Sequence, residues 1–209
     1  MVNITSLSEI LHGSRSILGL DAYGVLYNNL GLFDTIPAVF DFCNQHQIPI
    51  YMMTNNATQS IPDISAKMRQ FGCPIPDHQI ISSGCGCYLI DHIKSILYQR
   101  SVFVYGYSSS RFYVEQAGGF IVESPADADV IVYAASQSVE NHHMYKAVHD
   151  AIKLKPTMPL VCINPDHYVR NRNGFMRVMG HYTHQMMHQL QRDDCIWMGK
   201  PYSSFSDLV

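Results

Sequence analysis

Long apolar runs and an excess of either charge are both missing from this 209-residue sequence. No stretch of about 18 apolar residues occurs, which excludes a membrane-spanning helix. The sequence carries 14 Lys and Arg against 17 Asp and Glu, so no basic surface for non-specific nucleic-acid binding is expected. The segment from Met1 to Gly13 lacks a basic head followed by an apolar stretch, and no secretory signal is predicted. We therefore expect a cytoplasmic protein with no membrane span and no nucleic-acid partner.

Metal-binding patterns of cysteine and histidine are also weak. Cys85-Gly86-Cys87 is a close pair, but without a second pair or a histidine at ligand spacing it is poor evidence for zinc. His181, His184 and His188 would share one face of a helix, where they could bind a transition metal or simply line a partly exposed surface. No acidic or cysteine partner accompanies them, so the exposed surface is favoured.

The hydrophobic fraction of 47% is enough for a buried core, and its pattern alternates short apolar runs with helical periodicity. We predict strands over Ser16–Leu20, Ile48–Met53, Val102–Tyr105, Phe120–Val122, Val130–Ala134, Leu160–Ile163 and Cys195–Met198. We predict helices over Ile36–His46, Ile61–Phe71, Tyr88–Tyr98, Arg111–Ala117, Asn141–Leu154 and Tyr182–Leu190. Strand, helix and strand in this order predict an α/β fold with parallel sheets, in which one unit interrupts another.

Polar residues stand at three of the predicted strand ends: Asp21, the triplet Thr54-Asn55-Asn56, and Lys200. In parallel α/β sheets, ligands bind where the loops at the carboxyl ends of strands converge. An aspartate there can serve as a nucleophile or metal ligand, a threonine hydroxyl can hold a phosphate, and a lysine can neutralise a phosphoryl oxygen. Each signal alone is weak, and their order along the chain strengthens them.

These motifs together resemble those of class IIA phosphatases of the haloacid dehalogenase (HAD) superfamily. Asp21-Ala22-Tyr23-Gly24-Val25-Leu26-Tyr27 is similar to the first motif, Thr54-Asn55-Asn56 to the second, and Gly199-Lys200-Pro201 to the third. Ile81-Ser82-Ser83-Gly84 resembles the hinge into the cap, and Cys162-Ile163-Asn164-Pro165-Asp166 resembles a cap motif. The resemblance implies a Rossmann-like core with a parallel sheet and an inserted α/β cap. It predicts a first core segment at 1–84, the cap at 85–180 and a second core segment at 181–209.

The resemblance also implies a mechanism. Asp21 would attack phosphorus and form an aspartyl-phosphate, while Mg²⁺ would bind Asp21 and the backbone carbonyl of Tyr23. Thr54, Asn55 and Asn56 would hold the phosphate, and Lys200 would offset its charge. The expected function is a magnesium-dependent phosphatase acting on a small or aryl phosphate.

Two departures from the family pattern leave an alternative open. Tyr23 stands where most active members have a second aspartate as general acid and base, and a phenol is a poor base at neutral pH. The fourth, acidic motif should lie beyond Val209, so we expect a C-terminally truncated core, either as a fragment of a longer protein or as a product that lacks part of the metal site. The alternative is a weakly active or inactive HAD-like module that binds a phosphorylated ligand or a protein partner.

In the family pattern, Asn164 and Asp166 would project from the cap and help to choose the substrate, although Asn-Pro-Asp is also an ordinary turn sequence. Arg170, Arg172 and Arg177 could meet an anionic substrate, but solvated surface is favoured. A homodimer through the cap is compatible with the resemblance. The physiological substrate cannot be deduced from the sequence.

Overall fold

The computed structural model describes residues 16–135, 142–171 and 174–208. The strands are β1 (Leu18–Asp21), β2 (Tyr27–Asn28), β3 (Gly31–Leu32), β4 (Ile50–Thr54), β5 (Ile80–Ser82), β6 (Ser101–Tyr105), β7 (Phe120–Ile121), β8 (Val130–Tyr133), β9 (Leu160–Cys162), β10 (Tyr168–Asn171), β11 (Gly174–Arg177) and β12 (Ile196–Trp197). The helices are α2 (Ile36–Gln45), α3 (Ile61–Gln70), α4 (Gly86–Leu89), α5 (Asp91–Leu97), α6 (Arg111–Gln116), α7 (His142–Leu154), α8 (Met179–Leu190) and α9 (Ser203–Ser206). The predicted α/β fold with parallel sheets is confirmed.

The described chain divides into two compact units. The first comprises residues 16–53 and 64–80, and the second comprises 54–63 and 81–208. In the first unit, β1 and β4 pair in parallel, as the predicted strand–helix–strand pattern requires. The sheet that contains them has the order β1-β4-β5.

Helix α2 connects β1 to β4 and shows why this stretch is helical. Pro37 lies at the start, where its missing N–H costs no helical hydrogen bond. Ile36, Phe40 and Cys43 recur at helical spacing and are all buried. The helix therefore covers the core with one apolar stripe, as predicted.

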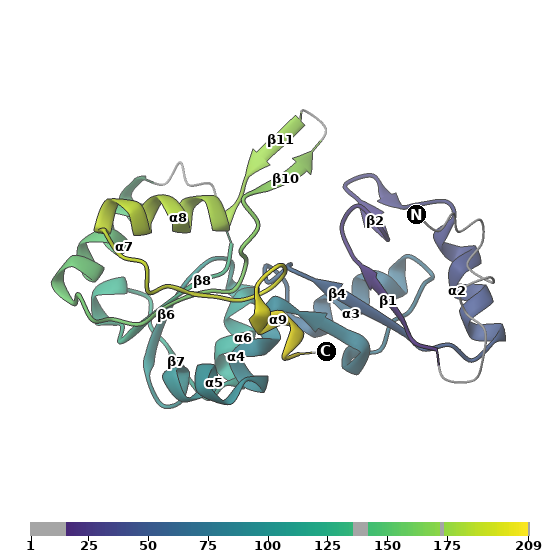
Figure 1. Ribbon diagram of the computed structural model, residues 1–209, viewed down its shortest axis with the longest axis horizontal. Helices are drawn as coiled ribbons and strands as arrows, with labels where there is room; N and C mark the ends of the chain where they lie inside the picture. The colour runs from purple at the N-terminus through teal and green to yellow at the C-terminus, as the bar shows by residue number, and fades with distance from the viewer. Residues whose placement is uncertain (1–15, 136–141, 172–173, 209) are drawn as a thin grey trace. The chain divides into compact units, whose positions relative to one another are not determined.

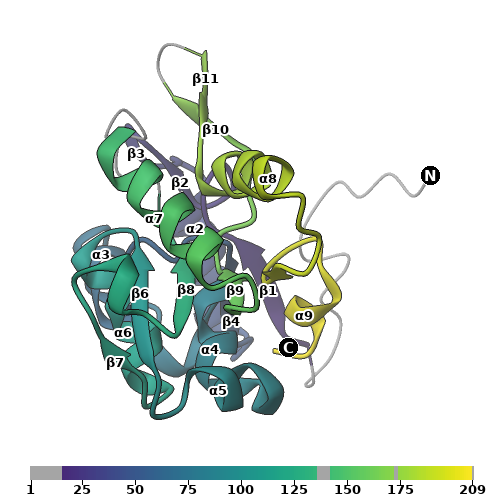
Figure 2. The same ribbon diagram turned by 90° about the vertical axis from the view of Figure 1, so that its left-hand side faces the viewer.

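The second unit is built on a parallel sheet of order β12-β9-β8-β6-β7. Helices α7 and α8 cover one face of this sheet, and α4, α5 and α6 cover the other (Figures 1 and 2). Because both faces are covered, its central strands are apolar throughout: every residue of β8 and β9 is buried.

The core under α7 and α8 is one continuous apolar cluster. Strand residues Phe103, Ile131 and Leu160 lie in it together with Ile152 of α7 and Met186 of α8. Two tyrosines on adjacent strands also belong to it, Tyr105 and Tyr133, whose buried hydroxyl oxygens have no hydrogen-bond partner among the described residues. Their burial raises the pKa of both phenols.

The single helix predicted over Tyr88–Tyr98 is wrong. Ile90 adopts an extended conformation, with φ of −98° and ψ of 112°, so that α4 ends at Leu89 and α5 begins at Asp91. Ile90 is itself buried, and Ile93 and Leu97 continue the buried stripe on α5. The apolar period survives the break, which is why the sequence pattern does not reveal it.

An antiparallel hairpin, β10–β11, was not predicted. Its strands pair from Tyr168 with Arg177 to Asn171 with Gly174. All four residues of β11 are exposed, so the segment has no alternation of buried and exposed positions that would mark a strand. Arg170 and Arg177 are exposed, whereas Arg172 lies outside the described residues.

Strand β12, in the predicted second core segment, pairs in parallel with β9 of the five-stranded sheet. The expected boundaries at 84 and 180 stay predictions. None of the helices in the described ranges has the length and apolar character that crossing a bilayer requires.

Candidate active site

Asp21 is the last residue of β1, and the pairing with β4 fixes its register. Residues Leu18 to Asp21 lie opposite Ile50 to Met53, so that Asp21 is the partner of Met53. Thr54, the last residue of β4, follows Met53 directly. Since adjacent parallel strands end at the same edge of a sheet, this register brings the chain at Asp21 and the start of the Thr54-Asn55-Asn56 triplet to one edge.

The loop after Asp21 is closed by main-chain hydrogen bonds. The N–H groups of Leu26 and Tyr27 both donate to the carbonyl of Ala22, at 2.9 and 3.2 Å, and the N–H of Gly24 donates to the carbonyl of Tyr27 at 2.7 Å. Gly24 has a φ of +91°, which a residue with a side chain rarely adopts. This tight turn holds the backbone on either side of Tyr23.

Tyr23 packs against another aromatic ring. Its ring meets that of Tyr27 edge to face, with 6.2 Å between centroids and an interplanar angle of 87°. The ammonium of Lys67 lies 3.9 Å from the centroid of the Tyr27 ring, and burial lowers the pKa of Lys67. The phenol of Tyr23 is thus positioned by a buried neighbour.

The triplet after β4 is ordered by its own side chains. Thr54 is buried, and its hydroxyl oxygen accepts a hydrogen bond from the N–H of Asn56 at 3.0 Å. The side-chain oxygen of Asn56 accepts from the N–H and the hydroxyl of Thr58, and the carbonyl of Asn56 accepts from the Ser82 hydroxyl at 2.8 Å. The triplet is therefore a rigid turn.

Asn55 links the triplet to two distant segments of the second unit. Its Nδ2 donates to Oδ1 of Asp166 at 2.7 Å and to the carbonyl of Lys200 at 2.8 Å. Its Oδ1 accepts from the N–H of Lys200 at 2.8 Å. The Ser83 hydroxyl lies 3.1 Å from the Asn55 carbonyl and 2.5 Å from the Ile163 carbonyl, so the hinge segment joins the same network.

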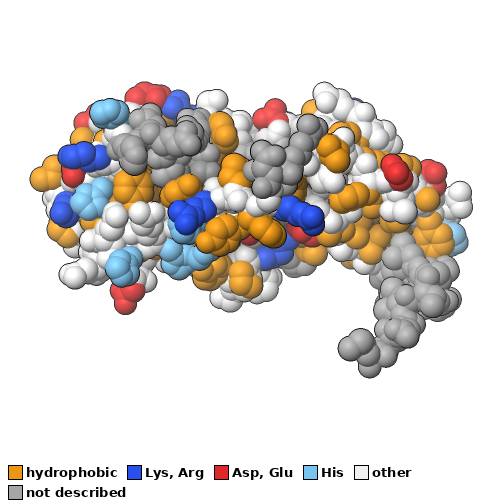
Figure 3. Space-filling model, turned by 90° about the horizontal axis from the view of Figure 1, so that it is seen from above, with side chains coloured by type: hydrophobic (Ala, Val, Ile, Leu, Met, Phe, Trp, Pro, Cys, Tyr) orange, Lys and Arg blue, Asp and Glu red, His pale blue; other side chains and the backbone are white. Residues whose placement is uncertain are grey.

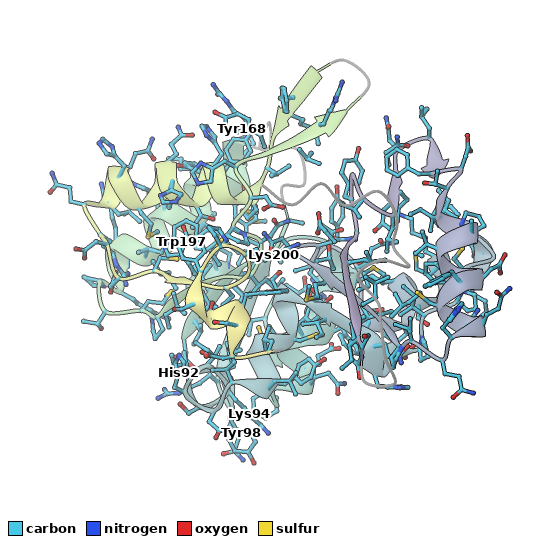
Figure 4. All side chains as sticks on the ribbon, turned by 45° about the vertical axis from the view of Figure 1, so that its right-hand side comes forward. His92, Lys94, Tyr98, Tyr168, Trp197 and Lys200 are labelled. Carbon is cyan, nitrogen blue, oxygen red and sulfur yellow. The ribbon has the colours of Figure 1, made fainter. Side chains whose placement is uncertain are left out.

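Lys200 follows β12 in the turn that leads to α9, and Figure 4 labels it together with Trp197 on this segment. Gly199, directly before it, has a φ of +108°. A Cβ at Gly199 would lie 2.6 Å from Oδ1 of Asn55 and 3.0 Å from Cδ of Pro165, so only glycine allows this approach. The ammonium of Lys200 lies 5.8 Å from the centroid of the Phe205 ring.

The two residues predicted on the cap differ in environment. Asn164 is 8% exposed, and its buried Oδ1 has no hydrogen-bond partner within the part of the chain that the structure describes. Asp166 is exposed and bonded to Asn55, and its carbonyl accepts from the N–H of Gly180 at 2.9 Å. A buried carbonyl oxygen without a partner is costly and suits a site that a ligand completes.

The structure brings together three of the predicted site residues, Asn55, Asp166 and Lys200, within the second unit. Thr54, Asn56 and Asn164 belong to that unit, whereas Asp21 and Tyr23 belong to the first. A pocket shared by Asp21, Thr54 and Lys200 stays a prediction. The bridging role of the Asn55 side chain was missed from sequence, because its partners lie 111 and 145 positions away.

Two oxygen ligands for a divalent cation are available in this loop, the carboxylate of Asp21 and the backbone carbonyl of Tyr23, two residues further on. Oxygen donors of this kind suit Mg²⁺, which keeps several waters in its octahedral shell. Within the described ranges, no three His, Cys, Asp or Glu side chains gather in a way that could hold a metal ion. The donor types thus fit Mg²⁺, with much of its shell left to water and substrate.

A stack of aromatic rings flanks the Lys200 turn. The Trp197 ring stacks on His184, with centroids 4.1 Å apart, and on Tyr202, with centroids 5.7 Å apart. Burial, His167 and His181 together lower the pKa of His184. His184 and His188 are exposed on α8, and Figure 3 shows histidine side chains gathered on this face, so the predicted surface face is confirmed.

Residues 18–119 match the family model described as haloacid dehalogenase-like hydrolase. A curated relative, the acid sugar phosphatase of Staphylococcus haemolyticus (strain JCSC1435), is 20% identical over 164 residues. That alignment covers 78% of this chain and 60% of the relative, so the chain spans about 60% of the length of the relative it matches.

Solved structures share the fold. A hypothetical protein from Pyrococcus horikoshii OT3 superposes with a TM-score of 0.77 at 19% identity, covering 92% of this chain and 74% of that one. A p-nitrophenyl phosphatase from Archaeoglobus fulgidus superposes with a TM-score of 0.75 at 18% identity, covering 92% of this chain and 73% of that one. With its motifs in order and this match over residues 18–119, the chain resembles the haloacid dehalogenase-like hydrolases and shares the fold of these solved structures.

Proposed function

We propose that this chain carries the active site of a class IIA, magnesium-dependent phosphomonoesterase that works through an aspartyl-phosphate on Asp21. One observation carries the proposal: Asp21 ends β1 in register with Met53, one residue before the buried Thr54. A carboxylate nucleophile and a phosphate-binding hydroxyl at one sheet edge are what phosphoryl transfer requires. The names of the phosphatases that this chain resembles agree with a small phosphorylated substrate.

In the first step, a carboxylate oxygen of Asp21 forms a bond to phosphorus as the bond to the leaving oxygen breaks. The leaving group departs with the bonding pair and takes a proton from the Tyr23 phenol or from solvent. In the second step, water adds to phosphorus as the bond to Asp21 breaks, and the proton of that water returns to the Tyr23 oxygen or to solvent, so that inorganic phosphate leaves and the free carboxylate and phenol are restored. As a carboxylate, Asp21 attacks phosphorus directly, without a helper base to remove a proton.

Three groups of this chain would stabilise the negative charge of the phosphoryl group. The Thr54 hydroxyl and the Asn55 N–H would hold phosphoryl oxygens, and the Asn56 turn would support them. The Lys200 ammonium would offset the charge of nucleophile and phosphate. When bound at Asp21 and the Tyr23 carbonyl, Mg²⁺ supplies further positive charge for the phosphoryl oxygens.

Tyr23 favours substrates whose leaving group needs little protonation. A phenol donates a hydrogen bond but is a poor general base. A phenolate leaves more readily than an alkoxide, so an aryl phosphate suits this site better than an alkyl phosphate.

The same tyrosine favours one second candidate, a weakly active or inactive module that binds a phosphorylated ligand or a protein partner. The phosphatase hydrolyses its substrate, whereas the binding module does so weakly or not at all; both are expected to bind phosphate. A homodimer through the cap, a cytoplasmic location, and substrate selection by Asn164 and Asp166 are further predictions.

Hydrolysis of p-nitrophenyl phosphate with Mg²⁺, and after removal of Mg²⁺ by a chelator, tests the proposal. Asp21→Asn should abolish metal-dependent turnover, whereas Asp34→Asn, the same change at an exposed aspartate of the first unit, should leave it unchanged. Turnover that survives in Asp21→Asn contradicts the proposal. Absent turnover with retained binding of inorganic phosphate supports the binding module.

A further inference from the structure

We infer that Asn55 is a positioning residue whose side-chain carboxamide fixes the Lys200 main chain and ties it to Asp166. The inference deepens the proposed function and rests on it for the role of Lys200. It assigns the Asn55 side chain a task other than contact with phosphate.

The first support is that the Asn55 carboxamide already uses both of its hydrogen-bond donors and its oxygen acceptor within the protein. Both hydrogens of Nδ2 are used, one on Oδ1 of Asp166 at 2.7 Å and one on the Lys200 carbonyl at 2.8 Å. Oδ1 accepts the Lys200 N–H at 2.8 Å. With both donors engaged, the side chain has no hydrogen left to offer a phosphate oxygen.

The second support is the geometry at Lys200. The Asn55 carboxamide bonds both the N–H and the carbonyl of this one residue, as a neighbouring strand would. Two hydrogen bonds on either side of a Cα fix the backbone direction there, and hence the origin of the lysine side chain. A displacement of about 1 Å at a catalytic group can cost about 10²-fold in rate.

The third support is burial and close packing. Asn55 is 7% exposed and its hydrogen bonds to Lys200 are partly buried, so removing its side chain takes one partner from the N–H and one from the carbonyl of Lys200. Gly199 has no room for a Cβ beside Oδ1 of Asn55, at 2.6 Å, or beside Cβ of Ser83, at 2.9 Å. Four segments thus meet at this carboxamide without space for another arrangement.

Asp166 acts on Lys200 through the same carboxamide. Its Oδ1 fixes which way the Asn55 amide faces, because a flipped amide would set two oxygens against each other. The carboxylate at this position therefore orients the lysine turn, whatever else it does toward a substrate.

Two measurements test the inference. The first needs no activity: amide hydrogen exchange at Lys200, followed by NMR, should accelerate about tenfold or more in Asn55→Ala and in the shape-matched Asn55→Leu, which both lack the acceptor for the Lys200 N–H. Asn44→Ala, at an exposed asparagine on α2, should leave that exchange rate unchanged. Unchanged protection of Lys200 in a folded Asn55→Leu protein overturns the inference.

The second is a double-mutant cycle on kcat with p-nitrophenyl phosphate. Asn55→Ala should lower kcat by about 10²-fold in the wild-type background and have little further effect in Lys200→Met, because Asn55 acts through Lys200. Asp166→Asn, which keeps an acceptor for Nδ2, should lose less than Asp166→Ala. Additive losses overturn the inference. If the wild-type chain shows no turnover, the proposed function fails while the exchange measurement still decides the role of Asn55.

Discussion

Asp21 and Met53 are register partners at the carboxyl ends of two parallel strands, and Thr54 is the next residue along β4. The backbone pairing of β1 with β4 is sufficient to place these residues at one edge of the sheet. After the Asp21 carboxylate, the Thr54 hydroxyl is therefore the group whose removal tests the proposed phosphate site most directly.

Thr54→Val removes the hydroxyl and keeps the shape. We expect kcat/KM for p-nitrophenyl phosphate to fall about 10-fold or more, since a hydrogen bond to a charged group contributes about 1.5–3 kcal/mol. Thr54→Ser keeps the hydroxyl and should stay close to the wild-type value. A loss in Thr54→Ser that is absent in Thr54→Val would mean that the methyl group, rather than the hydroxyl, is what matters.

Tyr23→Asp introduces the acid and base that most active family members carry. We expect turnover of an alkyl phosphate to rise more than that of an aryl phosphate, within the range of about 10²–10⁴ that such a group contributes. Tyr23→Phe, which keeps the ring against Tyr27, is the control and should raise neither. A Tyr23→Asp protein that loses turnover of both substrates would show that the phenol itself is needed.

Gly199→Ala should destabilise the second unit. Its φ of +108° and the short approaches to Asn55 and Ser83 both oppose a side chain. Urea denaturation should show a loss of about 2 kcal/mol or more in unfolding free energy. Gly174→Ala is the matched control, because Gly174 has a φ of +123° and no atom of the described residues lies within 4 Å of the added Cβ. A loss no larger at Gly199 than at Gly174 would contradict crowding as the cause.

Trp197 is the single tryptophan, so its fluorescence reports on His184 stacked 4.1 Å away. The pKa of His184 lies below its ordinary value of 6.5 in the folded chain, mainly through burial. The imidazole therefore binds a proton more tightly in the unfolded chain than in the folded one. The contribution of His184 to the free energy of unfolding is lost as the pH falls below 6.5 and through the pKa of the folded state. We expect a fluorescence transition with its midpoint below 6.5, absent in His184→Gln. A midpoint above 6.5, or one that persists in the variant, would assign the signal to another group.

The sequence predicts the elements that have a strong period and misses those that do not. Strands β6, β8 and β9 are short apolar runs, and α2 carries a clear stripe, so all four are recognisable. All four residues of β11 in the hairpin β10–β11 are exposed, so this strand leaves no such trace. The break at Ile90 is hidden because the buried residues keep their spacing across it.

The candidate site is predictable to a similar extent. Residues at strand ends can be found from the end of an apolar run, as Asp21 and Thr54 were. The contacts of Asn55 depend on a fold that brings positions 55, 166 and 200 together, and no local pattern encodes such distances. Sequence therefore identifies the residue types of the chemistry, while the side chain that orients the lysine turn emerges only from coordinates.

Covalent trapping of phosphate on Asp21 is the most direct test of the mechanism. The chain is mixed with p-nitrophenyl phosphate and Mg²⁺, quenched in acid within the first turnovers, digested, and analysed by mass spectrometry. The account predicts a phosphorylated peptide that contains Asp21, and none in Asp21→Asn. Release of p-nitrophenol without phosphate on that peptide, or phosphate on a different residue, would contradict it.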